Sequence, residues 1–156
     1  MSNLTRARVS IGTTRFADVV SPSARVETLI EFDGEAGTGA QGSVPLFTVT
    51  GAVLIDKILA VCEEDLVGAS ATLALGVTGA TTQFIAATTA TNIDVDELWV
   101  SDAPNANAIA LPTACLNTLI HQDIIGTVAT ADITAGQIRI VVLYTPISAD
   151  GEVTPV

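Results

Sequence analysis

Short apolar runs separated by glycine, proline, asparagine and aspartate are the feature that most constrains how this chain folds. In the segment 24–33, apolar residues alternate with charged ones, so that Val26 and Ile30 share one face and acidic residues the other. Alternation with a period of two predicts a β-strand that is buried on one side only. The run 137–145 is apolar on both sides toward its C-terminal half, which predicts a strand in the centre of a sheet.

Five further runs have the length and the β-branched composition of strands. They span residues 44–50, 52–62, 71–78, 82–90 and 123–130. The run 52–62 is also compatible with a short helix, and Pro45 fits only the start of an edge strand because proline lacks a backbone N–H. Since the strands do not alternate with helices, the sequence predicts an all-β fold, either an antiparallel β-sandwich or a jelly-roll-like barrel.

The connecting segments predict specific local structures. Residues 34–43 hold four glycines and predict a long flexible loop. The acidic triplet 63–65 predicts a charged turn that ends the preceding strand and discourages edge pairing. Residues 92–108 predict a turn, a brief strand and an exposed loop, which Trp99 anchors to the core. The stretch 109–119 has apolar residues at helical spacing and predicts at most one helical turn, because Pro112 interrupts it.

Size and composition exclude several classes of protein. A chain of 156 residues with 49% hydrophobic and only 15% charged residues is too apolar for intrinsic disorder and long enough for one core. No run approaches the roughly 18 apolar residues of a membrane-spanning helix, so we expect no membrane partner. The net charge of −11 repels a phosphate backbone, so we expect no nucleic-acid partner.

The charge is unevenly distributed along the chain. Arginines outnumber acids near the N-terminus, whereas the rest of the chain is strongly acidic. We therefore divide the chain into a basic N-terminal arm, residues 1–23, and a single β domain, residues 24–156. The arm suits contact with an acidic neighbour, such as another copy of the chain, or it is a solvated, frayed end. The candidate contact residues are Arg6, Arg8, Arg15 and Phe16.

The two cysteines, Cys62 and Cys115, lie in apolar surroundings. The start of the sequence, MSNLTRARVS, lacks the apolar segment of a secretory signal, which indicates synthesis and folding in a reducing cytoplasm. In that compartment two widely separated cysteines are usually apolar fillers. We therefore expect both to be free, buried thiols.

Residues that commonly carry chemistry do not form a recognisable motif. His121 is the only histidine, and no GxSxG motif accompanies it, so we expect a surface histidine and no enzyme. CxxC and HExxH spacings are missing, which argues against zinc. Acidic residues between Asp94 and Asp102 offer oxygen ligands for Ca²⁺, but their spacing is not that of an EF-hand, and a solvated loop is the default. The glycines of residues 34–43 do not follow a phosphate-binding pattern, and we expect no cofactor.

Three stretches carry a family resemblance. They are GSVPLFTVTGAVLIDKILAVC, ATLALGVTGATTQFIAATTATNIDVDELWV and HQDIIGTVATADITAGQIRIVVLYTPISADGEV. Together they cover roughly residues 40–153, and the chain resembles the capsid decoration, or cement, proteins and related head-associated structural proteins of tailed bacteriophages. The resemblance implies a β-rich homotrimer that binds the major capsid protein on the exterior of the virion, after synthesis in the host cytoplasm. Its arm would reach a neighbouring trimer or the capsid, for example by adding residues 9–16 as a strand.

Other functions are compatible with the same pattern. The chain could form the base or anchor of a head spike or fibre, or a host-attachment module, and its partner would then include a spike or fibre protein. Sugar binding is disfavoured because Trp99 and Tyr144 are the only residues of their types. A jelly-roll hydrolase would require His121, so replacing this histidine by alanine would abolish its activity. A secreted bacterial adhesin domain is disfavoured by the missing signal segment.

Overall fold

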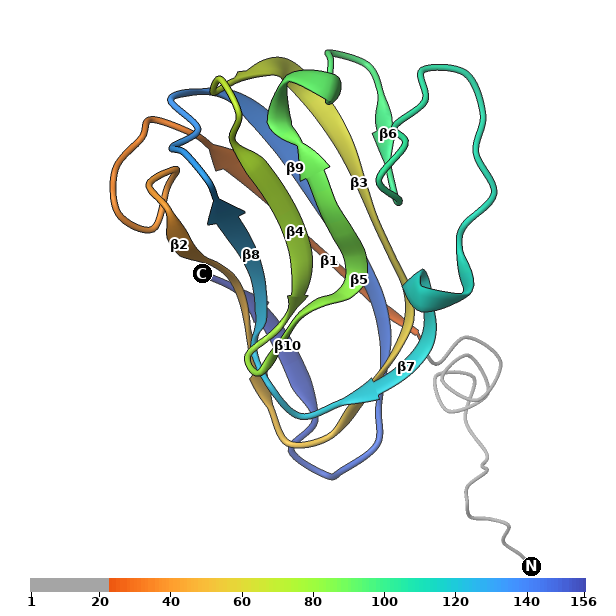
Figure 1. The fold of residues 1–156 in the computed structure, drawn as a ribbon. Helices are drawn as coiled ribbons and strands as arrows, with labels where there is room; N and C mark the ends of the chain where they lie inside the picture. The colour runs from red at the N-terminus through yellow and green to blue at the C-terminus, as the bar shows by residue number, and fades with distance from the viewer. Residues whose placement is uncertain (1–22) are drawn as a thin grey trace, which may run out of the picture.

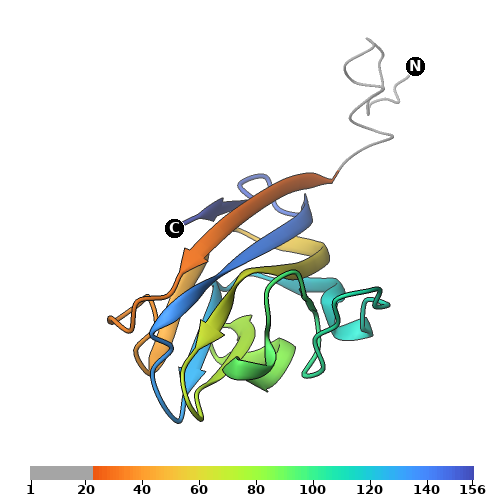
Figure 2. The same cartoon turned by 90° about the horizontal axis from the view of Figure 1, so that it is seen from above.

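The computed structural model describes residues 23–156, which form two antiparallel β-sheets packed face to face (Figures 1 and 2). The predicted contact residues of the arm, Arg6, Arg8, Arg15 and Phe16, lie outside the described residues. The predicted all-β class is confirmed. In this part of the chain, no helix has the length and apolar character needed to cross a membrane.

We call the sheet that contains β1 the first sheet. Its strands follow the order β1 (Ala24–Glu31), β9 (Ala135–Pro146), β3 (Val53–Val67) and β6 (Leu98–Trp99), and β7 (Leu116–Ile120) also pairs with β3. The second sheet has the order β10 (Glu152–Pro155), β2 (Gly42–Thr50), β8 (Ile124–Ala129), β4 (Thr72–Val77) and β5 (Ala80–Thr89). Single turns of 3₁₀-helix lie at Ala90–Asn92 and Thr113–Cys115.

The core lies between the sheets and is filled by the alternate residues that period-two patterning assigns to one face. In β9, the buried residues include Ile138, Ile140, Val142 and Tyr144, as the alternation predicts. β9 pairs with β1 on one side and β3 on the other, which confirms the prediction of a central strand. The position is favourable because both faces of β9 are largely apolar.

The region around β3 confirms one prediction and overturns another. The run 52–62 is a strand, as predicted, and the alternative of a short helix is excluded. The acidic triplet 63–65 is not a turn, so that prediction was wrong, because β3 continues through it to Val67. The strand is irregular there, with register shifts between Cys62 and Glu64 and between Glu64 and Val67. Long pairing with β9 holds this segment extended, and bulges are a common way to accommodate residues that do not fit the pleat.

The loop that follows β1 is more structured than its glycine content predicts. The Asp33 carboxylate accepts hydrogen bonds from the Glu35 backbone N–H (2.9 Å) and the Thr38 hydroxyl (2.6 Å). The Ile133 N–H donates to the Gly39 carbonyl (2.8 Å), which ties the loop to the segment before β9. These contacts hold residues 33–40 as a compact turn, so the prediction of a long flexible loop was wrong.

The remaining local predictions have mixed outcomes. Trp99 lies in the brief strand β6 and is buried, as predicted, and the predicted helical turn is the 3₁₀ turn before β7. Pro45 lies inside β2, which is not an edge strand, so that prediction was wrong as stated. β10 pairs only with Phe47–Thr50, however, so Pro45 lies on the part of β2 that β10 leaves uncovered. On the other side of β2, Pro45 pairs with Ile125 of β8, next to a register shift before Phe47, and such irregular positions tolerate proline.

Candidate docking surface

The side of the first sheet that faces away from the core carries a cluster of aliphatic residues among charged ones. We call it the outer face of the first sheet. Its apolar members are Leu29 on β1, Val141 and Leu143 on β9, Leu59 and Val61 on β3, and Leu98 on β6. An antiparallel sheet with one solvated face usually carries polar residues there. Contiguous aliphatic residues on such a face are typical of an interaction surface.

All three basic residues of the described chain lie on this same face. Arg25 and Lys57 are the cross-strand neighbours of Leu143, and Arg139 lies between Leu29 and Val61. Residues 23–156 contain sixteen acidic residues, of which Glu27, Glu31, Asp56, Glu63 and Glu64 belong to this face. The other eleven form no ion pair with a basic residue of the described chain. The outer face of the first sheet therefore has a much smaller excess of negative charge than the rest of the described chain.

Arg139 joins two strands through its guanidinium group. Its Nη1 donates to Glu27 Oε1 at 2.8 Å, and its Nη2 donates to Glu63 Oε1 at 3.1 Å. Nε of Arg139 also pairs with Glu63, and Arg25 pairs with Glu27. The hydrogen bonds from Arg25 and then Arg139 lower the pKa of Glu27, and those to Glu63 and Glu27 raise the pKa of Arg139. Both groups therefore stay charged at neutral pH, which fixes their geometry at the centre of the face.

The two sides of this face have complementary shapes. On β1, Leu29 protrudes and is 40% exposed. At the opposite side, a groove of about 190 Å³ opens between β3, β6 and the loop before β7. It is lined by Leu59, Ala60, Leu98, Val100, Ile109 and Leu111. All six are aliphatic, so the groove suits an apolar side chain.

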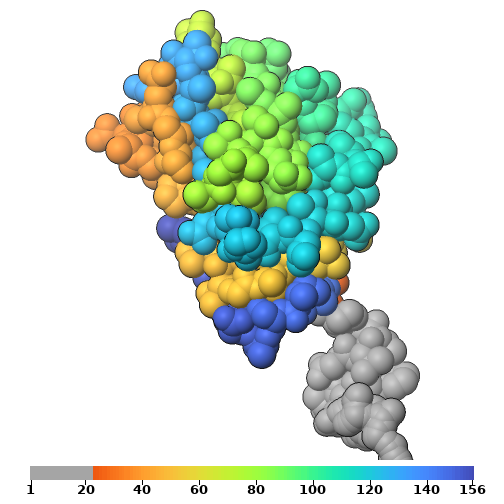
Figure 3. Space-filling view, turned by 60° about the horizontal axis from the view of Figure 1, so that its bottom comes forward, coloured from red at the N-terminus to blue at the C-terminus, as the bar shows by residue number. Residues whose placement is uncertain are grey.

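The outer face of the second sheet has a different character. Its exposed positions on β2 and β8 are mostly small or hydroxyl-bearing, such as Thr48, Thr50 and Ala129. Exposed residues of β5 lie at the centre of the view in Figure 3, whereas β4 is almost entirely buried. Between the β4–β5 turn and β7 lies a groove of about 270 Å³, lined by residues such as Gln83, Thr118 and Gln122. This groove mixes polar and apolar groups without a charged side chain.

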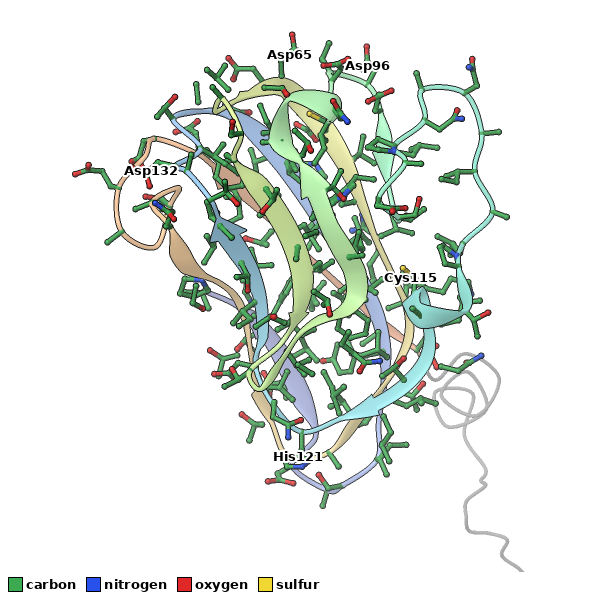
Figure 4. The ribbon with its side chains drawn as sticks, in the orientation of Figure 1. Asp65, Asp96, Cys115, His121 and Asp132 are labelled. Carbon is green, nitrogen blue, oxygen red and sulfur yellow. The ribbon has the colours of Figure 1, made fainter. Side chains whose placement is uncertain are left out.

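His121 lies next to this second groove, in the exposed connection between β7 and β8 (Figure 4). Its Nε2 lies 3.3 Å from Nε2 of Gln122. The prediction of a surface histidine is confirmed.

Both cysteines are free and buried, as predicted. Burial raises the pKa of each thiol to about 11. The Cys62 Sγ lies 3.2 Å from the Glu64 carbonyl oxygen, and the Cys115 Sγ lies 3.5 Å from the Phe84 carbonyl oxygen. At neutral pH both side chains are thus neutral thiols that pack in the core, and their chemical reactivity is low.

Of the acidic residues that the sequence offered as Ca²⁺ ligands, Glu97 is used within the loop itself, and Asp65 of β3 also supports the loop. The Glu97 carboxylate accepts from the Asp94 backbone N–H (3.0 Å), and the Asp65 carboxylate accepts from the Val95 N–H (2.6 Å). Asp65 and Asp96 lie at the same end of the sandwich, opposite His121 (Figure 4). Among residues 23–156, no three His, Cys, Asp or Glu side chains are grouped to hold a metal ion.

Sequence reasoning missed the outer face of the first sheet. The signal was present, since the segment 137–145 has Val141 and Leu143 on the side opposite its core residues. Apolar residues on both sides of a strand favour burial on both sides, whereas the structure leaves this side without a covering layer in the described chain. The groove could not be predicted, because it joins β3 to residues some 40 to 50 positions later in the sequence.

Comparisons of the chain with protein-family models, with curated proteins and with solved structures found no match.

Proposed function

We propose that this chain is a virion structural protein, a capsid decoration or cement protein that binds the exterior of a tailed-phage head as an oligomer. The observation that carries the proposal is the strand order. Four strands follow β1-β9-β3-β6 in one sheet and four follow β2-β8-β4-β5 in the other. Most consecutive strands cross between the sheets, whereas β4 and β5 stay within the second sheet and β6 and β7 within the first. This order supports a jelly roll, an architecture that viral capsid proteins use.

We further propose that the chain acts by surface contact and not by catalysis. The accessible features that stand out in residues 23–156 are a sheet face with aliphatic residues among ion-paired ones and an apolar groove, which suit a protein partner. The two thiols are buried and protonated at neutral pH, which is unfavourable for nucleophilic attack.

The proposed mechanism is thermodynamic. A protein that binds the assembled shell more tightly than free capsid subunits stabilises the shell by the difference in binding free energy. A rigid two-sheet domain suits this role because little conformational entropy is lost on docking. The partner is the major capsid protein. Arg6, Arg8, Arg15 and Phe16 of the arm remain the proposed contacts to the capsid or to a neighbouring copy, and the expected number of copies, three, comes from the resemblance.

A co-sedimentation assay tests this function. Purified full-length chain is mixed with heads of the phage that encodes it, prepared without the chain, and the bound fraction is measured after centrifugation. We expect saturable binding and a higher melting temperature of the loaded heads. A variant that lacks residues 1–22 should bind more weakly if the arm contributes. Heads that bind no protein at micromolar concentration would contradict the proposal.

A further inference from the structure

We propose that the outer face of the first sheet packs against the same face of a second copy about a two-fold axis. The inference identifies the surface through which copies of the decoration protein associate, and it therefore rests on the proposed function. Its starting point is one row of neighbouring residues across the sheet. Leu29 pairs with Arg139, Arg139 pairs with Val61, and Val61 pairs with Leu98.

This row has the protruding Leu29 at one end and the apolar groove beside Leu98 at the other. Three strand spacings of about 4.8 Å separate the two ends by about 14 Å. We place a two-fold axis in the plane of the interface, parallel to the strands and midway between β9 and β3. Rotation about this axis puts the β1 end of the row in one copy opposite the β6 end in the other. Leu29 of each copy then lies over the groove of the other, which is the reciprocal pattern of an isologous interface.

Charge favours a second copy on this surface. The described chain has sixteen acidic and three basic residues, and all three bases lie on this face. An approach through the acidic end of the sandwich, where Asp94, Asp96 and Glu97 are found, would bring carboxylates together without a compensating cation of the described chain. On the outer face of the first sheet, the Arg139 guanidinium already pairs with Glu27 and Glu63, so the centre of the interface carries little net charge. The three cations therefore make this face more favourable for self-association than the acidic end of the sandwich.

The area of the face is at the low end for a specific contact. Three strands of about eight residues, at about 4.8 Å spacing and about 3.4 Å rise, give together with the two residues of β6 a face of about 425 Å² in projection. Two such faces bury about 850 Å², so a specific interface of at least about 1,000 Å² also requires the adjoining loop. The loop before β7, which forms the far wall of the groove, adds to this area. The smallest assembly with this contact is a dimer, in place of the trimer that the resemblance implies.

Sedimentation velocity of the full-length chain and its variants tests the inference. Wild type should sediment near twice 15.9 kDa. Leu29→Lys and Ile109→Asp should each raise the dimer dissociation constant at least about tenfold, because each places a charge in the apolar contact. The double variant should recover much of the affinity, since the introduced ammonium group of one copy would face the introduced carboxylate of the other across the two-fold axis. Thr48→Lys, at an exposed position of the second sheet, is the matched control and should sediment as wild type.

The possible outcomes separate this inference from the proposed function. A wild-type monomer or trimer at about 100 µM overturns the two-fold contact even if a variant fails to fold. Single variants that dimerise like wild type also overturn it, and if they lose head binding, the face belongs to the capsid contact. A double variant weaker than both singles contradicts the pairing of Leu29 with the groove. An intact dimer that ignores phage heads supports the contact and contradicts only the decoration function.

Discussion

Thr88 and Thr127 each have a buried hydroxyl group, but only that of Thr88 is hydrogen-bonded within the described chain. Thr88 is buried, and its Oγ1 accepts from Trp99 Nε1 (2.9 Å) and donates to the Ala86 carbonyl (3.0 Å). The Oγ1 atom of Thr127 is also buried, yet it has no hydrogen-bond partner among the described residues. A buried hydroxyl stabilises the fold only when it is paired.

The substitution of valine at these two positions should therefore have different effects. Thr88→Val leaves the indole N–H of Trp99 without an acceptor and should lower the free energy of unfolding by about 1–3 kcal/mol. Thr127→Val removes an unpaired polar atom and should be neutral or stabilising. Urea unfolding followed by tryptophan fluorescence measures both. Equal destabilisation by the two variants would contradict the assigned hydrogen bonds.

Acid should weaken the ion pairs on the outer face of the first sheet. The pKa of Glu27 lies below its ordinary value of 4.5 in the folded protein, because Arg25 and Arg139 donate to its carboxylate. Its stabilising contribution is therefore complete above the unfolded pKa and is lost as the pH falls through the folded pKa. Glu27→Gln should be less stable than wild type at a pH of about 6, and this difference should shrink at a pH of about 2.

Urea unfolding at several pH values measures this difference directly. The comparison with wild type at each pH is needed, because protonation also relieves the repulsion among the other carboxylates of this acidic chain. Glu152→Gln, on the edge strand β10, is the control and should keep a nearly constant difference. A constant difference for Glu27→Gln would show that its ion pairs do not stabilise the fold.

At the scale of elements, the junction of β3 with β9 depends on Gly136. This residue has a φ of +110°, and a Cβ atom there would lie 2.5 Å from the Asp65 carbonyl oxygen and 2.6 Å from Leu66 Cδ2. The close approach lies opposite the irregular end of β3, where the register shifts between Glu64 and Val67. The acidic triplet can remain in the strand because Gly136 leaves room for the displaced backbone.

Alanine at this position should be strongly destabilising. Gly79 provides the matched control, since its φ of +93° is also positive but a Cβ atom at this position would have no other atom within 4 Å. Gly79→Ala should lower the free energy of unfolding by about 1–2 kcal/mol from backbone strain alone. Gly136→Ala adds a steric clash and should cost more, as thermal unfolding would show. Equal losses would indicate that backbone strain accounts for both.

Periodicity predicted the strands well where one face is buried and the other is wet. β8 alternates between buried and more exposed residues, whereas β4 is buried at five consecutive positions, residues 73–77. Periodicity therefore located these strands better than it predicted which of their faces are exposed. It failed at residues 63–65, because charge in a strand is tolerated when the side chains reach solvent or an ion pair such as Glu63 with Arg139. β10 was not predicted, since its four residues are too short for a periodic signal. The docking surface depends on how strands are ordered in the sheet, which local patterns do not encode.

At the scale of the whole molecule, the thiols report on the integrity of the core. Cys62 and Cys115 are buried, and their pKa values of about 11 leave only about 0.1% thiolate at a pH of about 8. In native buffer, the rate at which iodoacetamide labels them should therefore be limited by opening of the fold. In urea, where the chain is unfolded, labelling should be rapid. Mass spectrometry counts the labels. A thiol that reacts within seconds in native buffer would contradict a closed sandwich.

The central claim is that this acidic two-sheet domain works through the outer face of its first sheet, which pairs with the same face of a second copy on a phage head. A cryo-electron microscopy map of heads loaded with the full-length chain tests it most directly. The account predicts added density on the outside of the shell, resolved into pairs of domains that meet through β1, β9, β3 and β6. Heads without added density, or domains whose first sheet faces solvent, would contradict it.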